Sequence, residues 1–121
     1  MSTPLDFIRM VQRGEAAPPP IADLIGFTLT EVEPGRAVIA FDAGPRHANP
    51  MGTLHGGVLC DIADAAMGMA YAASLDEGET FLKGGHTVGL VECDVVDDKD
   101  RLVARASSTC MTLRGEQAEG R

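Results

Sequence analysis

A polar, glycine-rich segment over residues 47–64 holds most of the groups that could do chemistry. It places Asn49 and His55 just before the pair Gly56-Gly57. Two adjacent glycines let the backbone approach a ligand closely and can open a helix. The first amides of a helix lack partners inside it and lie at the positive end of its dipole, so they can bind a carbonyl oxygen and, more strongly, the oxyanion it becomes. The segment therefore predicts a site that polarises a carbonyl group.

A long helix, predicted over residues 56–75, must position these amides. Its apolar stripe has helical spacing and consists of Leu59, Ile62, Ala63, Ala66, Met69, Ala70 and Ala73. At about 100° per residue, Asp64 points almost opposite this stripe, with Asp61 beside it. The face opposite the stripe holds no Lys, Arg or Glu. From its position alone, Asp64 is either a reactive carboxylate or one that faces solvent or pairs with an arginine, and we expect Asp61 to be structural or a loop anchor.

The spacing of Gly56 and Asp64 constrains any mechanism that uses both. They are eight residues apart, which on one straight helix is about 12 Å. The two groups of one chain therefore cannot touch one small reacting carbonyl. Such a mechanism requires Asp64 from a second copy of the chain and predicts a symmetric dimer.

The remaining elements follow from periodicity and turn residues. In chain order we expect a helix over residues 3–13, an extended Pro-rich connector over 16–20, a hairpin of strands over 27–33 and 36–41, an irregular loop over 43–54, the long helix, a hairpin of strands over 87–96 and 102–113, and a loose tail over 115–121. This order indicates one α+β domain over residues 1–121 with a mainly antiparallel sheet, in which residues 1–20 form an N-terminal helix and linker.

Composition excludes several classes of function. Ten Lys and Arg stand against 18 Asp and Glu, for a net charge of −8, which argues against nucleic acid or an anionic membrane as a partner. No apolar run approaches the roughly 20 residues that span a bilayer. The three cysteines have no framework spacing, which suits a reducing, cytoplasmic location.

The residues 49–57, Asn-Pro-Met-Gly-Thr-Leu-His-Gly-Gly, with Asp64 nine positions after His55, resemble a known family. The pattern resembles that of the hotdog-fold acyl-CoA thioesterases, in particular the phenylacetate-degradation (PaaI-like) branch of the 4-hydroxybenzoyl-CoA thioesterase superfamily. The resemblance covers residues 5–81 and 86–114. It implies an antiparallel sheet wrapped around the long central helix.

The resemblance also implies a reaction, the hydrolysis of a small or medium acyl- or aryl-CoA thioester to free acid and CoA without a cofactor. Gly56 would offer its amide to the thioester oxygen, and His55 would help to hold that oxygen or the loop. Asn49 would help to position the attacking water. Asp64 of the partner subunit would act as general base or as nucleophile.

Further residues are expected to bind the substrate. Gly57 lies beside the reacting carbonyl, Met51 and Met67 are adaptable side chains that suit an acyl pocket, and Arg114 suits the phosphates of CoA. The acyl group would lie between subunits of a homodimer or of a dimer-of-dimers tetramer. The acyl chain itself is left open.

The chain departs from the family after Phe81. Hotdog thioesterases place two long strands between the helix and the last hairpin, one at the dimer edge and one in mid-sheet, whereas only residues 81–86 fill that interval here. The alternatives are a true internal deletion and an intervening segment that is not part of this sequence, and we favour the second. Relatives carry a Ser or Thr hydroxyl just beyond this point, for which Lys83 is no substitute.

Structural roles are open for several of these residues. His55 can cap the helix, Asn49 can hold the loop through its amide, and the two glycines can serve only the tight entry to the helix. Cys60 is expected to pack in the core. The spacing of His47, His55, Cys60 and Asp64 matches no zinc signature, so we expect no metal.

Two other functions are considered. A non-catalytic module that binds acyl-CoA or another ligand is favoured by the shortened chain and the missing hydroxyl. A hydratase acting on enoyl-CoA would need an Asp–His pair shortly after the helix entry, and His86 has no such partner, so we do not favour it.

Overall fold

The computed structural model describes residues 3–76, 80–83 and 88–119. In chain order the elements are α1 (Pro4–Gln12), α2 (Pro20–Ile25), β1 (Phe27–Glu33), β2 (Arg36–Phe41), a 3-10 turn (Pro45–His47), α3 (Gly56–Ala72), β3 (Thr80–Lys83), β4 (Val88–Val96), β5 (Leu102–Leu113) and a second 3-10 turn (Gly115–Ala118). The two predicted hairpins and the long helix are confirmed, although α3 ends at Ala72. The second 3-10 turn lies in the segment expected to be a loose tail.

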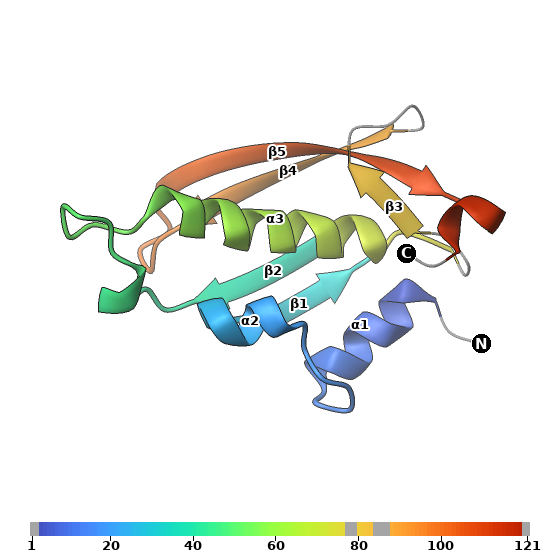
Figure 1. Cartoon of the computed structure of the whole chain (residues 1–121), viewed down its shortest axis with the longest axis horizontal. Coiled ribbons are helices and arrows are strands. Elements are labelled where there is room, and N and C mark those ends of the chain that lie inside the picture. The colour runs from blue at the N-terminus through green and yellow to red at the C-terminus, as the bar shows by residue number, and fades with distance from the viewer. Residues whose placement is uncertain (1–2, 77–79, 84–87, 120–121) are drawn as a thin grey trace.

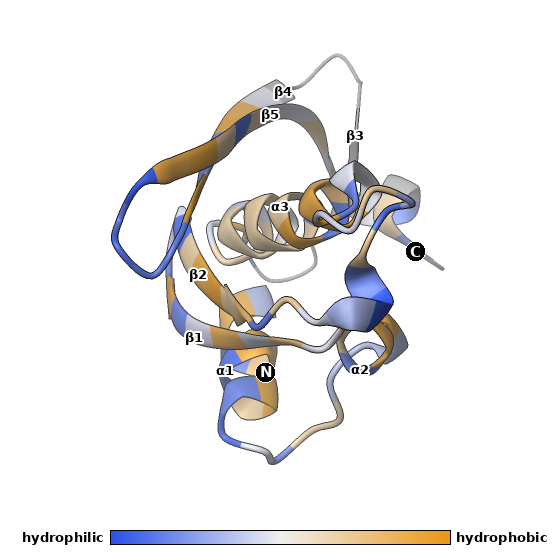
Figure 2. Cartoon of the chain, turned by 90° about the vertical axis from the view of Figure 1, so that its left-hand side faces the viewer, coloured by the Kyte–Doolittle hydropathy of each residue, from blue (hydrophilic) through white to orange (hydrophobic). Residues whose placement is uncertain are grey.

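The long helix α3 lies between two antiparallel sheets (Figure 1). One sheet is the hairpin β1-β2, and the other has the strand order β3-β5-β4. Figure 2 shows α3 nearly along its axis, within the curved layer that β1, β2, β4 and β5 form. The predicted arrangement, an antiparallel sheet wrapped around a central helix, is confirmed.

The apolar pattern of each element explains this packing. On α3 the buried residues are Ile62, Ala63, Met67 and Ala70. Along β4 exposure alternates, because Gly89, Val91, Cys93 and Val95 are half-buried whereas Leu90, Glu92, Asp94 and Val96 are exposed. A strand presents alternate residues to opposite faces. β4 therefore turns one set toward α3 and the other toward solvent.

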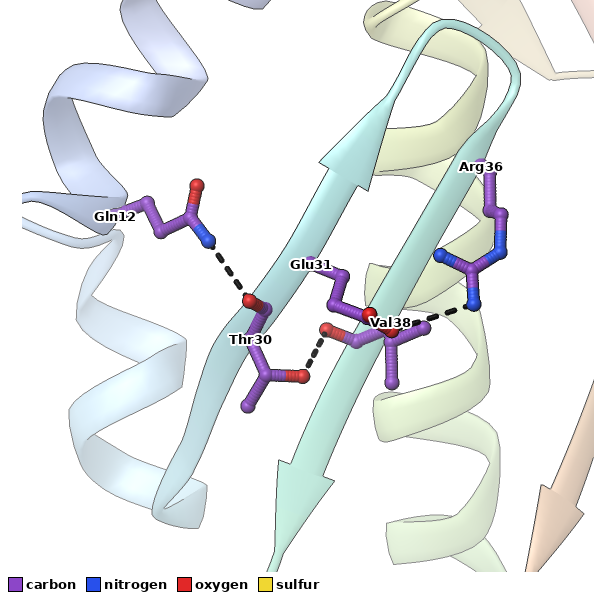
Figure 3. A network of polar contacts seen from close by, with 5 residues as sticks. All are labelled: Gln12, Thr30, Glu31, Arg36 and Val38. Atoms are coloured by element: carbon purple, nitrogen blue, oxygen red, sulfur yellow. Dashed lines mark hydrogen bonds and ion pairs between the residues drawn. The ribbon is translucent and has the colours of Figure 1, made fainter.

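A β-bulge fastens α1 to the first hairpin. The register of β1 against β2 shifts between Leu29 and Glu31, which leaves Thr30 as the extra residue. The Gln12 side chain donates to the Thr30 carbonyl at 2.8 Å, and the Thr30 hydroxyl donates to the Val38 carbonyl at 3.1 Å (Figure 3). The polar groups that the bulge exposes are thus satisfied by side chains.

The helix α2 was not predicted. The Pro-rich stretch indicated an extended connector, but Pro20 occupies the first turn of the helix, where a missing N–H costs nothing. Gly26 ends the helix at φ 93°, a conformation that favours glycine. Ala22 is buried and joins Phe27 and Ile62 in the core, so this short helix covers one end of α3.

An interior strand position between β2 and β4 is left open by the described residues. Among them β2 pairs with β1 alone and β4 with β5 alone. Both strands run in the same direction (Figure 1), so an antiparallel strand between them would join the two sheets into one. The resemblance implied that two strands are missing. The position of one of them is occupied by the four-residue β3, which lies beside β5 at the edge of its sheet.

The junction predicted after Phe81, residues 82–85, lies only partly in the described part of the chain, because residues 82 and 83 end β3 and residues 84–87 lie outside it. His86 and the side chain of Lys83 lie outside it too. Within residues 3–76, 80–83 and 88–119, no helix combines the length and apolar character that crossing a membrane requires.

Candidate active site

The N-terminus of α3 is capped by a histidine. His55 is the N-cap residue, and its Nδ1 accepts the amide hydrogen of Gly57 at 2.9 Å. An imidazole nitrogen that accepts a hydrogen bond carries no proton, so in the neutral ring the proton resides on Nε2. His55 is exposed. The predicted alternatives, helix cap and oxygen donor, are therefore compatible, because Nδ1 caps the helix while Nε2–H remains a donor.

The amide of Gly56 is the first of the helix. Within the described residues it donates to no acceptor. A Cβ placed on Gly56 would meet no atom within 4 Å, so the space over this residue is open. The first turn of α3 holds no acidic residue. This end of the helix thus keeps the positive end of its dipole accessible to a carbonyl oxygen.

Gly57 has a structural role in the helix cap. Its amide is already bound to His55, so it is not available to a substrate in this conformation. A Cβ on Gly57 would lie 2.9 Å from Nδ1 of His55, closer than such contacts allow. The absence of a side chain on Gly57 therefore leaves space for the imidazole ring. Gly57 affects the candidate site by positioning His55.

The loop before the helix is organised by Asn49. Its Oδ1 accepts from the amides of Met51 at 3.0 Å and Thr53 at 3.1 Å, and its Nδ2 donates to Oγ1 of Thr53 at 2.8 Å. These bonds are the loop-holding alternative considered from sequence. They leave one Nδ2 hydrogen for a water molecule. Met51, at the tip of the loop, is 85% exposed and lies outside the core.

His47 is a positioning residue that sequence reasoning considered only as a metal ligand. It is buried, its Nδ1 accepts from the Gly44 amide at 3.0 Å, and its Nε2 faces the Ile25 carbonyl at 2.9 Å. Its own carbonyl accepts the His55 amide at 2.9 Å. The ring thus joins α2 to the loop that ends at His55. Because α2 itself was not predicted, the sequence held no signal for this link.

Asp64 and Asp61 lie on the open face of α3. Both are exposed in the single chain. Asp64 and Gly56 belong to the same unbroken helix, so their predicted separation of about 12 Å stands. Cys60 is exposed on this face, so the prediction that it packs in the core is wrong. The apolar type of the residue was misleading, because the two sheets leave this side of α3 uncovered.

Met67 and Arg114 are not brought to the start of α3. Met67 is 5% exposed and packs inside the fold. Arg114 follows β5, whose end lies at the opposite end of the molecule from the start of α3 (Figure 1). A binding role for either residue beside Gly56 of its own chain is therefore not supported by this geometry.

Among the described residues, no three His, Cys, Asp or Glu side chains gather in a way that could hold an ion. Both ring nitrogens of His47 and the Nδ1 of His55 already take part in hydrogen bonds. The described groups at the start of α3 are suited to hydrogen bonding with an oxygen.

Comparison with known proteins agrees with this architecture. The model of a family described as Domain of unknown function (DUF4442) matches residues 9–92. No curated protein sequence matches the chain. Among solved structures, a putative thioesterase of Ralstonia eutropha JMP134, described as a phenylacetic acid degradation-related protein, is 25% identical, with a TM-score of 0.71 over 86% of this chain and 98% of that one.

Two further structures are similar at lower identity. A thioesterase family protein from Silicibacter pomeroyi is 19% identical, with a TM-score of 0.74 over 89% of this chain and 99% of that one. The E. coli PaaI protein from the phenylacetic acid degradation operon is 17% identical, with a TM-score of 0.70 over 93% and 95%. The chain therefore has the hotdog fold of these thioesterase family proteins, as the sequence predicts.

Proposed function

The chain belongs to the family described as Domain of unknown function (DUF4442), and from this premise we propose that it is a hotdog thioesterase that hydrolyses acyl-CoA to free acid and CoA. The observation that carries the proposal is the pair of donors at the start of α3. The Gly56 amide and the Nε2–H of His55 belong to consecutive residues, and neither donates to an acceptor in the described part of the chain.

These donors suit the charge that develops in thioester hydrolysis. Water attacks the carbonyl carbon, and the carbonyl oxygen becomes an oxyanion that the Gly56 amide and His55 Nε2–H stabilise. When the tetrahedral intermediate collapses, the carbon–sulfur bond breaks and CoA leaves as a thiolate that takes up a proton. Asn49, which keeps one amide hydrogen beyond the loop bonds it makes, would orient the water.

The proton of the attacking water needs a base. Asp64 of the same chain lies about 12 Å along the helix from Gly56, too far to act there. We assign the base to Asp64 of the partner subunit, which then returns the proton to the leaving thiolate. In the alternative, the same carboxylate attacks the carbonyl carbon, and water hydrolyses the resulting anhydride.

The open face of α3 supports a homodimer. Gly57, Cys60, Asp61 and Asp64 are all exposed on this face in the single chain. A helix so apolar elsewhere is expected to be covered on most of its surface. A second copy packed against this face would bring Asp64 of the partner subunit toward the start of α3, and two equivalent sites would form.

Thiol release from a panel of acyl-CoA substrates tests the proposal. We expect the wild type to turn over at least one substrate and Asp64→Asn to lose about 10²-fold or more in kcat. Asp61→Asn is the matched control, because it removes a carboxylate one turn away on the same exposed face. Equal loss in both variants, or full turnover by Asp64→Asn, would contradict the assignment of Asp64.

The strand position between β2 and β4, which the described residues leave open, favours a second function, a module that binds acyl-CoA without hydrolysing it. In that case a folded dimer would bind a non-hydrolysable CoA thioether but release no thiol from any substrate. Calorimetry with the thioether, run beside the thiol assay, separates the two functions.

A further inference from the structure

A cavity occupies the open strand position between the two sheets. Its volume is about 350 Å³. The helix α3 contributes Leu59, Ile62 and Ala66 to its wall, and the strands contribute Ile39, Val95 and Val103. A second cavity of about 170 Å³ continues along the same strands toward the end of α3 and shares Ala37 with the first. The larger cavity is therefore apolar and reaches the inner face of α3, whereas the smaller one is also lined by the charged residues Arg36, Glu92 and Asp94.

The two carboxylates along this cavity do not make it a charged site. Asp94 and Asp97 are among its lining residues. Asp94 forms an ion pair with Arg105 at 2.6 Å, and Asp97 forms one with Arg101 at 2.7 Å. Each negative charge thus has an arginine beside it, and the remaining wall is mostly aliphatic. Such a wall suits an uncharged apolar group.

The larger cavity begins next to the candidate active site. Leu54 and Leu59 both line it, and these residues flank the sequence His55-Gly56 in which the two donors lie. By contrast, Asp64 is five positions from Leu59, about 140° around the helix. The cavity and Asp64 therefore lie on different sides of α3, and a ligand in the cavity would not occupy the face left for a partner subunit.

From this arrangement we propose that the cavity between β2 and β4 holds the acyl chain of the substrate. The inference rests on the proposed thioesterase function and on a true internal deletion after Phe81, because an intervening strand would fill the gap. It changes the expected place of the acyl group from between the subunits to the interior of one chain. The thioester carbonyl would lie at the Gly56 amide, and the chain would pass Leu54 and Leu59 into the gap. CoA would remain outside.

The size of the cavity sets the substrate class. At about 30 Å³ for a group the size of a water molecule or a methylene, a volume of about 350 Å³ has room for roughly ten carbon atoms. The wall offers no aromatic face besides that of Phe41, within the described residues. The occupant is a saturated medium-length acyl chain of about eight to ten carbons, not a short polar acyl group.

A chain-length series tests the proposal. For the wild type, kcat/KM should rise by up to about four-fold for each added methylene that becomes buried, and should stop rising near ten carbons. Ala37→Leu places a larger side chain on the wall that both cavities share. It should lower the ratio of kcat/KM for octanoyl-CoA to kcat/KM for acetyl-CoA by about ten-fold or more.

Ala40→Leu is the matched control on the same strand. Ala40 is exposed and is not among the lining residues of either cavity, so this variant should keep the wild-type chain-length profile. Thermal unfolding of both variants checks that each is folded. Equal loss of octanoyl-CoA hydrolysis in both folded variants, or an unchanged profile in Ala37→Leu, would overturn the proposal.

Binding of octanoate, measured by calorimetry, keeps this test independent of catalysis. If octanoate binds the wild type and Ala40→Leu but not Ala37→Leu, the cavity assignment is supported even where no thioester is hydrolysed. If thioesters are hydrolysed without chain-length preference and octanoate does not bind, the thioesterase stands and the cavity assignment fails. Binding of an alternating Val-Thr peptide in place of octanoate would assign the gap to strand insertion and would overturn the proposal.

Discussion

The Nδ1 atom of His55 accepts the amide hydrogen of Gly57 at 2.9 Å. The histidine thus caps α3 and directly precedes Gly56, whose amide is the first of that helix. The hydrogen bond fixes the orientation of the ring and, in the neutral form, leaves the proton on Nε2. One side chain thus combines a structural role with a chemical one, and a single alanine substitution would remove both.

Substitution of His55 by serine separates these roles. Serine caps helices well but does not reproduce the outward donor of the imidazole. We expect His55→Ser to unfold near the wild-type temperature and His55→Ala to lose about 1 kcal/mol of unfolding free energy. Both should lose roughly 10²-fold in kcat for thiol release. Wild-type turnover in His55→Ser would show that Nε2–H does not hold the substrate oxygen.

The two glycines should respond differently to alanine. In Gly57→Ala the new Cβ would lie 2.9 Å from Nδ1 of His55, so the ring must move and we expect a loss of about 1 kcal/mol in unfolding free energy. Gly56→Ala meets no atom within 4 Å and should be at least as stable as the wild type, because alanine favours helix. Thermal denaturation of both variants measures this, and the reverse order of stability would refute the described cap.

The ion pair between Asp94 and Arg105 predicts a dependence of stability on pH. The hydrogen bond from Arg105 lowers the pKa of Asp94 below its ordinary value of 3.8. A carboxylate whose folded pKa is depressed stabilises the fold above its unfolded pKa, and that contribution is lost as the pH falls through the lower, folded value. The difference in unfolding temperature between wild type and Asp94→Asn should therefore be constant near neutral pH and should vanish in strong acid.

Glu92→Gln is the control for this pH series. Glu92 is exposed on the same strand as Asp94, and the substitution removes one carboxylate charge, as Asp94→Asn does. Its effect should not follow the titration of Asp94. A difference between wild type and Asp94→Asn that persists undiminished below the folded pKa of Asp94 would show that the carboxylate stabilises the strand by some means other than its ion pair.

Much of the architecture could be predicted from periodicity. The alternation over residues 27–41 and the turn at Pro34-Gly35 defined the first hairpin, whose strands have the predicted bounds. The apolar stripe defined α3. These signals are local, because each depends on residues within one element or one turn. The glycine-rich segment over residues 47–64 also indicated His55 and Gly56, which the structure places together at the start of α3.

The rest depended on contacts between distant segments. The helix α2 was hidden by prolines that favour extended structure as readily as a first helical turn. The bond from His47 to the Ile25 carbonyl needed α2 to be known. Cys60 was misassigned because a helix inside a sheet need not be covered on every side by its own chain. The cavity results from the absence of a strand among the described residues. The short interval after Phe81 predicted missing strands, but no residue pattern indicated the cavity between β2 and β4.

The most direct test of the central claim, that two subunits build one site, is to mix two inactive variants. Each site would use His55 and Gly56 of one chain and Asp64 of the other. When dimers of Asp64→Asn and His55→Ser are dissociated and reassociated at equal amounts, half of the dimers should be mixed, each with one intact site. We predict recovery of about a quarter of wild-type turnover. No recovery, with mixed dimers verified by mass spectrometry, would contradict the shared site.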